Sequence, residues 1–368
     1  MAATFAQPSL VVLRLRATAK ALFGSPLNAL ITLAMLALFA KLLPALYQWA
    51  ISLGTVAGDN RQACLEGGAC WVFIRIRFHN LMYGDYPAPQ VWRVNVAGLA
   101  LIGLIIGAFL RQNPWRKQFV LLLVFAYPVL ALALIVGGFP RLPAVETRLW
   151  GGLMLNVVLA YVTVLGAVPL GLLLAEARRS KDASVRLLAT GFIELWRAAP
   201  LVTVLFMGIV VLPLMMPHGF EMNKFVGVAG ALVLFNSAYM AEAIRGGLQA
   251  VPAGQFQAAN ALGLGFWQAR YLIVWPQALR MSVPSIVNTA IDLFKDTSLV
   301  IILGLFDLLG SVQQATRDPH WLGLESEGYF FVAAIFFIIC TGLSMMSKAI
   351  ERELNAPEHR HHAPDDTA

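Results

Sequence analysis

Seven stretches of 17 to 25 residues contain no Asp, Glu, Lys or Arg, and they constrain the fold more than any other feature. Each is long enough to cross the roughly 30 Å hydrocarbon core of a bilayer as a helix. Strands of a membrane β-barrel would be far shorter and would alternate polar with apolar residues. The seven stretches are Ala21–Ala40, Val94–Leu110, Phe119–Phe139, Gly151–Ala175, Ala198–Pro217, Phe225–Ala241 and Tyr329–Ser347.

An eighth stretch, Met281–Leu309, is apolar apart from Asp292, Lys295 and Asp296. The composition agrees with a membrane protein, because 13% of the residues are charged whereas a soluble domain has roughly 25%. The mean hydropathy is +0.71. We therefore predict an all-α polytopic membrane protein with about eight transmembrane helices.

The distribution of basic residues predicts the orientation. With the N-terminus in the cytoplasm, 17 of the 27 Lys and Arg residues fall in cytoplasmic segments and eight in outside segments. Both termini are then cytoplasmic, and the net charge of +7 needs no nucleic acid to explain it. The first apolar run is too long for the core of a cleavable signal peptide, so we expect none.

The longest polar interruption in the second half of the chain is Tyr239–Arg280, on the predicted cytoplasmic side. A short helix is expected over Gln255–Leu262, ended by Gly263 as a left-handed cap. A second helix fits Phe266–Val274, and Trp275 is biased away from helical geometry because a proline follows it. A bare loop is rarely this long, so the segment is predicted to be a helix–turn–helix element.

This segment resembles the EAA loop of ABC-importer permeases, with the pattern E-A-A, three residues, G, nine residues, I-x-L-P. The matching positions, with the spacing intact, are Gln257, Ala258, Ala259, Gly263, Ile273 and Pro276. Gln257 replaces the glutamate and Trp275 replaces the leucine. The resemblance implies a type I importer permease core whose loop docks in a groove of a separate ATPase subunit. The missing carboxylate removes one possible contact with that subunit but not the shape.

Two further segments resemble signatures of the polar-amino-acid branch of these permeases. The first signature, Y-x-E-x-x-R-x-x-P-L, is matched from Phe192 through Glu194, Arg197, Pro200 and Leu201. Glu194 and Arg197 are three residues apart and could pair on a helix, and Pro200 suits the first turn of the next span. An ordinary basic anchor at the membrane surface is an equally good interpretation of Arg197.

The second signature, Y-x-A-E-x-x-R-G-G, is matched by Tyr239, Glu242, Arg245 and the two glycines that follow. Glu242 and Arg245 could pair across one turn. Capping of the helix end explains part of this pattern. Gly246 and Gly247 are expected to release the chain into the cytoplasm.

The charged span has two compatible interpretations. Lys295 is the central residue of Met281–Leu309, and a lone charge near the midplane would cost at least about 2.5 kcal/mol. Asp292 and Asp296 could offset this cost, either as part of a pair facing the bundle interior or as groups lining a path for a zwitterionic substrate. Residues 295–299 also resemble the K-D-T-S-L run of the amino-acid permease branch. The candidate path residues are Asn236, Tyr239, Glu242, Asp292, Lys295, Asp296, Thr297 and Ser298.

The predicted outside loop contains two closely spaced cysteines. Cys64 and Cys70 enclose two glycines and lie in an oxidising compartment if the predicted orientation holds, which favours a disulfide over two free thiols. A zinc site is disfavoured because His79 is the only histidine nearby. Cys340 is expected to pack inside the last span. The histidines of the C-terminal tail, His359, His361 and His362, could hold a metal, but a disordered tail is the expectation.

The resemblance organises the chain into three parts. Residues 1–149 form an N-terminal extension with three spans, 150–350 a five-helix permease core with its loop at 246–280, and 351–368 a tail. This plan is similar to that of the larger permease subunit of general L-amino-acid ABC importers. It implies a bacterial inner-membrane location, alternating access, and as partners two ATPase copies, a second permease subunit, a periplasmic amino-acid-binding protein and membrane lipid. Opine, histidine and arginine importers share these signatures.

The chain itself is not predicted to be an enzyme. No glycine is followed by lysine, so a Walker A phosphate loop is absent, and no cofactor or metal is implied. An ion-coupled secondary transporter using Asp292, Lys295 and Asp296 is the main alternative, but it would not need the cytoplasmic helix–turn–helix. A non-transporting scaffold is a third possibility, and it would gain nothing from charges inside a span.

Overall fold

The computed structural model describes residues 18–110, 113–140, 142–217 and 222–355. The chain divides into two compact units between Ile76 and Arg77, and each is described by itself. The basic lead before residue 18 and the tail histidines His359, His361 and His362 lie outside the described residues.

The first unit contains one long apolar helix, α2 (Pro26–Tyr47), which runs into a π-helical turn at Gln48–Ser52. Ser25 caps it by accepting a hydrogen bond from the Asn28 N–H at 3.1 Å. No side chain is buried along α2, which suits a helix whose surroundings are lipid rather than protein. Beyond it, Cys64 and Cys70 are joined by a disulfide.

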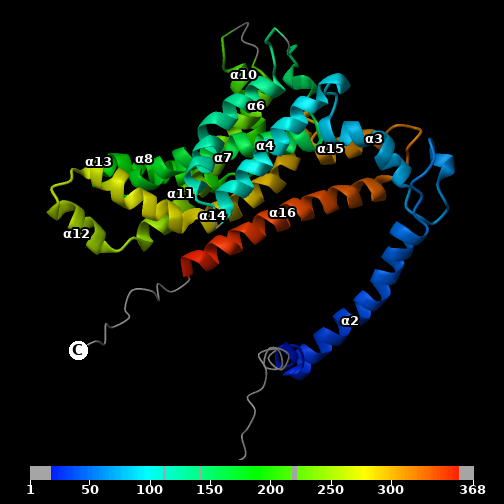
Figure 1. Ribbon diagram of the computed structural model, residues 1–368, viewed down its shortest axis with the longest axis horizontal. Coiled ribbons are helices and arrows are strands. Elements are labelled where there is room, and N and C mark those ends of the chain that lie inside the picture. The colour runs from blue at the N-terminus through cyan, green and yellow to red at the C-terminus, as the bar shows by residue number, and fades with distance from the viewer. Residues whose placement is uncertain (1–17, 111–112, 141, 218–221, 356–368) are drawn as a thin grey trace, which may run out of the picture. The chain divides into compact units, whose positions relative to one another are not determined.

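The second unit is a helical bundle (Figure 1). The described residues form no β-strand, only single β-bridges. Its elements in chain order are α3 (Trp71–Tyr83, which begins in the first unit), α4 (Val91–Phe109), α5 (Arg116–Leu121), a π-turn (Leu122–Ala126), α6 (Tyr127–Ile135), α7 (Gly152–Ala177), α8 (Ala183–Ala198), α9 (Leu201–Phe206), α10 (Leu212–Leu214), α11 (Lys224–Ala250), α12 (Ala253–Ala261), α13 (Phe266–Ala269), α14 (Trp275–Asp296), a 3-10 helix (Thr297–Leu303), α15 (Leu308–Ala315) and α16 (Glu325–Asn355).

Helix α11 lies at the centre of the bundle, packed against α7 on one side and α14 on another. Small residues allow these close approaches, as they do generally between membrane helices. A Cβ atom on Gly171 of α7 would lie 2.7 Å from the Cβ of Met240, and one on Gly247 of α11 would lie 2.3 Å from the Ala278 carbonyl oxygen of α14. The expectation that Gly247 releases the chain is therefore wrong. This glycine is a packing site, and α11 continues to Ala250.

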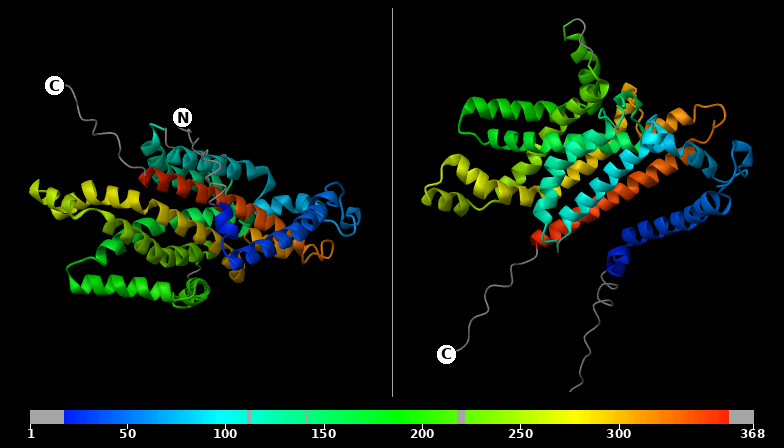
Figure 2. Two further views of the ribbon diagram at one scale, coloured as in Figure 1. Left: turned by 90° about the horizontal axis from the view of Figure 1, so that it is seen from below. Right: turned by 45° about the horizontal axis from the view of Figure 1, so that its top comes forward.

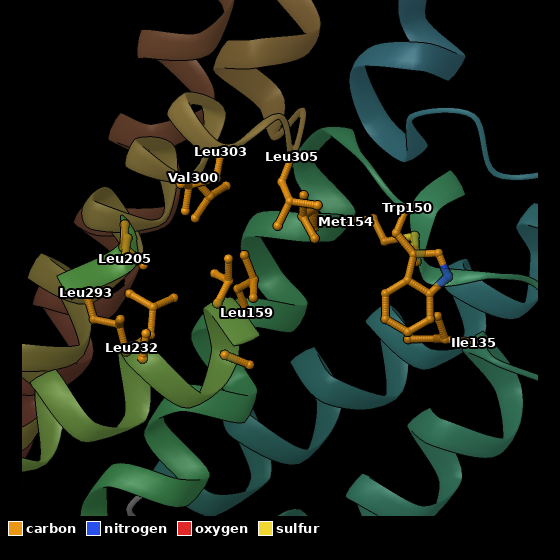
Figure 3. Close-up of a cluster of buried hydrophobic side chains, with 14 of the residues drawn as sticks. Ile135, Trp150, Met154, Leu159, Leu205, Leu232, Leu293, Val300, Leu303 and Leu305 are labelled. Carbon is orange, nitrogen blue, oxygen red and sulfur yellow. The ribbon is translucent and has the colours of Figure 1, made fainter. Parts of the chain in front are cut away.

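One hydrophobic cluster joins the two parts that the sequence analysis separates at residue 149 (Figure 3). Ile135 and Tyr86 come from the N-terminal extension, and Trp150, Leu232 and Leu293 come from the core. Residues 77–149 belong to the same compact unit as the core, so the packing units divide at a different place from the predicted modules. The boundary at residue 149 between the N-terminal extension and the permease core rests on the family resemblance and stays a prediction.

Fewer than the eight predicted spans are recognisable by length and hydropathy in the described residues. In the described part of the chain, six helices are long and apolar enough to cross a membrane, or seven when α8 with α9–α10 is taken as one bent span. The predicted span Ala198–Pro217 corresponds to Leu201–Leu214, which consists of α9, a π-turn (Met207–Val211) and α10, and the chain bends by 106° between α8 and this segment. Pro200 produces this break: it precedes α9 with extended geometry at its N-cap. In Figure 2 the α9–α10 segment projects from the bundle.

The remaining predicted span corresponds to α14 and the 3-10 helix, which are too polar to be recognised by hydropathy. One detail of its prediction is wrong. The chain does not break at Trp275, because the π-turn Arg270–Val274 carries the helix across Pro276 with Trp275 at φ −62° and ψ −43°. Lys295, the middle residue of the predicted stretch, lies one residue before the end of α14, and the 3-10 helix continues the span to Leu303. A π-turn is one of the few devices that accommodate a proline without ending a helix.

Replacing Gly171 with alanine tests the close packing of α11. The added methyl group would overlap Met240, so we expect a loss of about 1–3 kcal/mol in stability and a lower unfolding midpoint of the purified complex. Gly230 of α11 is the matched control, because no atom lies within 4 Å of a Cβ placed there. Gly230→Ala should leave the midpoint unchanged or raise it slightly. Equal midpoints for the two variants would contradict the packing account.

Candidate functional site

The predicted helix–turn–helix segment lies at one end of the bundle, here called the α12 end (Figure 1). Helix α12 spans Ala253–Ala261, and Gly263 follows it with φ +70°, in the left-handed region that the sequence predicts. The Leu264 N–H donates to the Ala259 carbonyl at 3.1 Å, which closes the turn. The chain then enters α13 at Phe266.

The two sides of this segment differ in exposure. Ala259 is completely buried, whereas Gln257 and Ala258 are exposed. Further along, Ile273 is half-buried and Pro276 is exposed. Large apolar side chains face outward around the turn, and these are Leu262, Phe266, Trp267, Tyr271 and Leu272. Such an exposed apolar surface next to polar residues is typical of a site that another protein covers.

The carboxylate of Glu176, at the end of α7, anchors the segment to the bundle. Its Oε2 forms an ion pair with Arg270 at 3.3 Å, and its Oε1 accepts a hydrogen bond from the Trp275 indole at 3.0 Å. The side chains of Glu176 and Arg270 are 11% and 13% exposed, so water screens this pair only weakly. The Arg270 guanidinium also stacks on the rings of Phe256 and Phe266, at 5.0 and 4.9 Å. Trp275, which departs from the family pattern, therefore has a defined partner.

A second charged network joins α7, α8 and α11 near the same end. Arg178 contacts Glu242 at 2.5 Å and Glu194 at 3.0 Å, and Arg245 contacts Glu242 at 2.8 Å as the sequence predicts. The expected pair between Glu194 and Arg197 is wrong. Arg178 takes Glu194 because it projects from the end of α7 toward α8, and the Arg197 guanidinium lies 5.8 Å from the Tyr239 ring centre instead. Pro200 lies at the N-cap of α9, where the chain bends.

Asp292 and Lys295 form an ion pair at 3.2 Å on one face of α14. Their side chains are 72% and 54% exposed, so in this chain the pair faces outward rather than into its own bundle interior. The face is hollowed. The residues around the hollow, from α14 and α16, are Asn288, Ile291, Asp292, Lys295, Phe337, Cys340, Thr341, Ser344, Met345 and Lys348.

The other predicted path residues lie in different places. Asn236 is buried and donates to the Leu232 carbonyl of its own helix at 3.0 Å. Tyr239 and Glu242 belong to the arginine network at the α12 end. Asp296 is half-buried, as is Ser298. The eight candidates therefore do not form one cluster, and Asp292 and Lys295 alone share the hollow.

Sequence reasoning missed a buried polar network built around Asn156 of α7. Its amide donates to the Thr297 hydroxyl at 2.8 Å and to the Asp307 carboxylate at 3.0 Å, and its carbonyl oxygen accepts from the Leu308 N–H at 3.0 Å. One side chain thus joins the start of the 3-10 helix that follows α14 to residues 307–308, which lie beyond its end. The signal for Asn156 is weak, since it is a single amide in an otherwise apolar run.

Three acidic side chains in the connection over residues 306–328 are held within the protein itself. Asp307 is fully buried in the network, and Asp318 is bound to Arg77. Glu327 is also buried, at 5% exposure. Within the described ranges, no three His, Cys, Asp or Glu side chains come together to hold a metal.

Apolar spanning helices around a central α11, with an anchored polar segment between two of them, define the architecture of a membrane permease subunit. Residues 167–355 match the family model described as "Binding-protein-dependent transport system inner membrane component", and the chain belongs to this family. It is a multi-pass inner-membrane protein that serves transport and is not itself an enzyme. Membership implies an ATPase and a binding protein as partners.

Three relatives show how far the similarity extends. The inner membrane amino-acid ABC transporter permease protein YhdY of Escherichia coli (strain K12) is 48% identical over 344 residues, 93% of either chain. The glutamate/glutamine/aspartate/asparagine transport system permease protein BztC of Rhodobacter capsulatus is 34% identical, covering 92% of this chain and 93% of its own. The probable glutamine ABC transporter permease protein GlnP of Bacillus subtilis is 31% identical, covering 55% of this chain and 92% of its own.

Glu176→Gln tests the anchor of the helix–turn–helix segment. Loss of the carboxylate leaves Arg270 buried and unpaired, so we expect a loss of about 3–5 kcal/mol and a lower unfolding midpoint of the purified complex. Arg270→Gln should act similarly, and the double variant should lose less than the two single losses combined. Glu146→Gln breaks an exposed ion pair with Arg148 and serves as the control, with almost no change expected. Strict additivity of the two single effects would show that Glu176 and Arg270 do not depend on each other.

Proposed function

We propose that the chain is a permease subunit through which L-amino acids enter the cell. The observation that carries this proposal is the Asp292–Lys295 pair, which presents one negative and one positive group in the hollow between α14 and α16. A zwitterionic amino acid has the complementary pair of charges. The names of YhdY and BztC, which describe amino-acid permeases, support the same substrate class. Opines, histidine and arginine are the alternative substrates of the same chemical type.

The exposure of this pair also supports a second permease subunit. A charged side chain that faces lipid at depth costs at least about 2.5 kcal/mol, and this face of α14 carries two. A second membrane subunit that covers the hollow would remove both charges from lipid and enclose a polar path between the subunits. We therefore propose that the path is shared by two permease subunits.

The exposed surface of α12 and the turn after it is the proposed docking site for the ATPase. Gln257 and Ala258 lie on the exposed side, and Gly263 gives the turn its shape. Two permease subunits would each bind one ATPase copy, which gives two copies per transporter. This arrangement requires the α12 end and both termini to be cytoplasmic, as the basic residues predict.

In this proposal a periplasmic binding protein delivers the amino acid at the opposite end of the bundle, and the transporter works by alternating access. Closure of the ATPase pair moves α12 and α13. Since α13, the π-turn and α14 form one continuous helix from Phe266 to Asp296, the movement reaches the charged face directly.

The experiment that tests this function is uptake of labelled L-amino acids into proteoliposomes. They contain this chain with its partner permease, ATPase and binding protein. The proposal predicts uptake that requires internal ATP. Uptake that persists without the ATPase and follows an ion gradient would instead identify a secondary transporter.

Gly263→Ala tests coupling within the same assay. The left-handed φ of +70° makes a side chain unfavourable by about 1–2 kcal/mol, so the docked shape should be populated roughly five- to thirtyfold less. ATP-driven uptake is expected to fall while the ATPase subunits still hydrolyse ATP. Gly265→Ala, two residues later at φ −63°, is the matched control and should transport normally. Equal uptake by both variants would exclude a coupling role for the turn.

Lys295→Met tests the path. Removal of the cation should raise the KM for L-amino acids and reduce uptake by about tenfold, the effect of losing one charge-assisted hydrogen bond. Lys41→Met on α2 is the control and should leave uptake unchanged. A double variant with Asp292→Asn separates the two interpretations of the pair. Recovery of uptake in the double variant would mean that Lys295 only neutralises Asp292.

A further inference from the structure

The N-terminal extension is joined to the permease core through main-chain pairing at the end of the bundle opposite α12, here called the α15 end. Gly84, which follows α3, forms an antiparallel β-bridge with Trp150, and Gly152 forms a parallel β-bridge with Asp307. The Gly152 N–H also donates to the Phe306 carbonyl at 2.9 Å. Three segments that are far apart in sequence therefore share one backbone junction. They are the turn after α3, the start of α7 and the connection before α15.

The junction leaves no room for a side chain. Gly84 has φ +67°, and a Cβ atom there would lie 2.5 Å from the Cα of Gly151. The turn is held from its other side as well. The Tyr86 side chain is buried and donates to the Ile135 carbonyl at 2.9 Å, and His79 contacts the Tyr86 carbonyl at 2.9 Å. Gly84 is therefore fixed between the extension and the core.

A second fastening lies further along the same surface. Arg77 of α3 forms an ion pair with Asp318, which follows α15, and both side chains are partly buried. Asp318 also accepts hydrogen bonds from the backbone and the ring of His320, at 3.0 and 2.9 Å. Hydrogen bonds from His320, together with the charge of Arg77, hold the pKa of Asp318 below its usual value. The carboxylate is therefore charged at neutral pH and available to Arg77.

We propose that residues 77–86 are a positioning element of the α15 end. They fasten the extension to the start of α7 and to residues 306–318, so that these three segments move as one rigid body during transport. In this assignment the part of the extension that begins at residue 77 supports the permease core. It supports the connection whose buried residue Asp307 closes the Asn156 network, and thereby it fixes the far end of the charged helix α14.

The comparisons agree with an added element of this kind. GlnP of Bacillus subtilis matches 55% of this chain over 92% of its own length, so that relative has no counterpart for much of the chain. YhdY and BztC match more than nine-tenths of it.

A crosslink between the two fastened segments tests the proposal directly. Arg77→Cys and Asp318→Cys are combined in a Cys340→Ser background and joined with a short bismaleimide in the assembled transporter. Uptake of a mixture of labelled L-amino acids is then compared before and after crosslinking. If the segments move as one body, crosslinking does not lower the uptake that the double-cysteine transporter shows before it is crosslinked. Loss of uptake on crosslinking, with assembly intact, would overturn the proposal because it would show that the segments must separate.

Charge exchange provides a second test that does not depend on the crosslink. Arg77→Glu and Asp318→Arg should each slow ATP-driven uptake by about tenfold, which corresponds to about 1.4 kcal/mol in a rate. The exchanged pair, carrying both substitutions, should restore much of the rate. Arg75→Glu breaks a more exposed ion pair with Asp59 at 3.3 Å and is the control, with no change expected. Normal uptake by both single variants would overturn the assignment of Arg77 as a positioning residue. So would an exchanged pair whose uptake stays as slow as that of the single variants.

Discussion

The close packing of α11 between α7 and α14 is the constraint on which the rest of the structure depends. Glycines at the crossing points let the backbones approach, as at Gly171 and Gly247, and this brings the ends of the neighbouring helices together. At one end, Glu176 of α7 then reaches Arg270 and Trp275, so the polar segment between α11 and α14 is anchored in the bundle. The segment is thus fixed to the bundle and is not a free loop.

Rigidity also explains how a displacement of α12 could act at a distance. The helix from Phe266 to Asp296 is continuous through its π-turn, and its far end is held by the Asn156 network through Thr297. The Asp292–Lys295 pair lies between these two held ends. In the proposed coupling, a push at one end of this helix would tilt or bend it as a whole and so change the shape of the hollow beside α16. Because one continuous helix runs from the helix–turn–helix segment to the charged pair, this coupling needs no additional chain of side-chain contacts.

Much of this could be predicted from the sequence, because hydropathy and spacing are local properties. The uncharged runs predicted six of the membrane helices, and the position of Gly263 in the helix–turn–helix pattern predicted its left-handed turn. The pair between Arg245 and Glu242 followed from helical periodicity alone. These predictions needed no knowledge of which helices are neighbours in space.

The predictions that were wrong or missing depend on tertiary contacts. Pro276 was expected to end a helix, but a π-turn just before it absorbs the irregularity. Glu194 was assigned the nearest cation in sequence, whereas Arg178 reaches it from another helix. Asn156 is an unremarkable residue of an apolar run until α14 and α15 place Thr297 and Asp307 beside it. Partner choice among charged and polar groups is decided by packing, which spacing alone does not give.

The central claim is that the exposed surface around Gly263 receives the ATPase, and a site-specific photocrosslink tests it most directly. Benzoylphenylalanine is introduced in place of Leu262, which is 75% exposed, and the assembled transporter is irradiated. Leu99 of α4, which is 71% exposed, is the matched control position. The account predicts a covalent product with the ATPase subunit from position 262 and none from position 99. A product from neither position, or from 99 alone, with the transporter assembled and active, would contradict it.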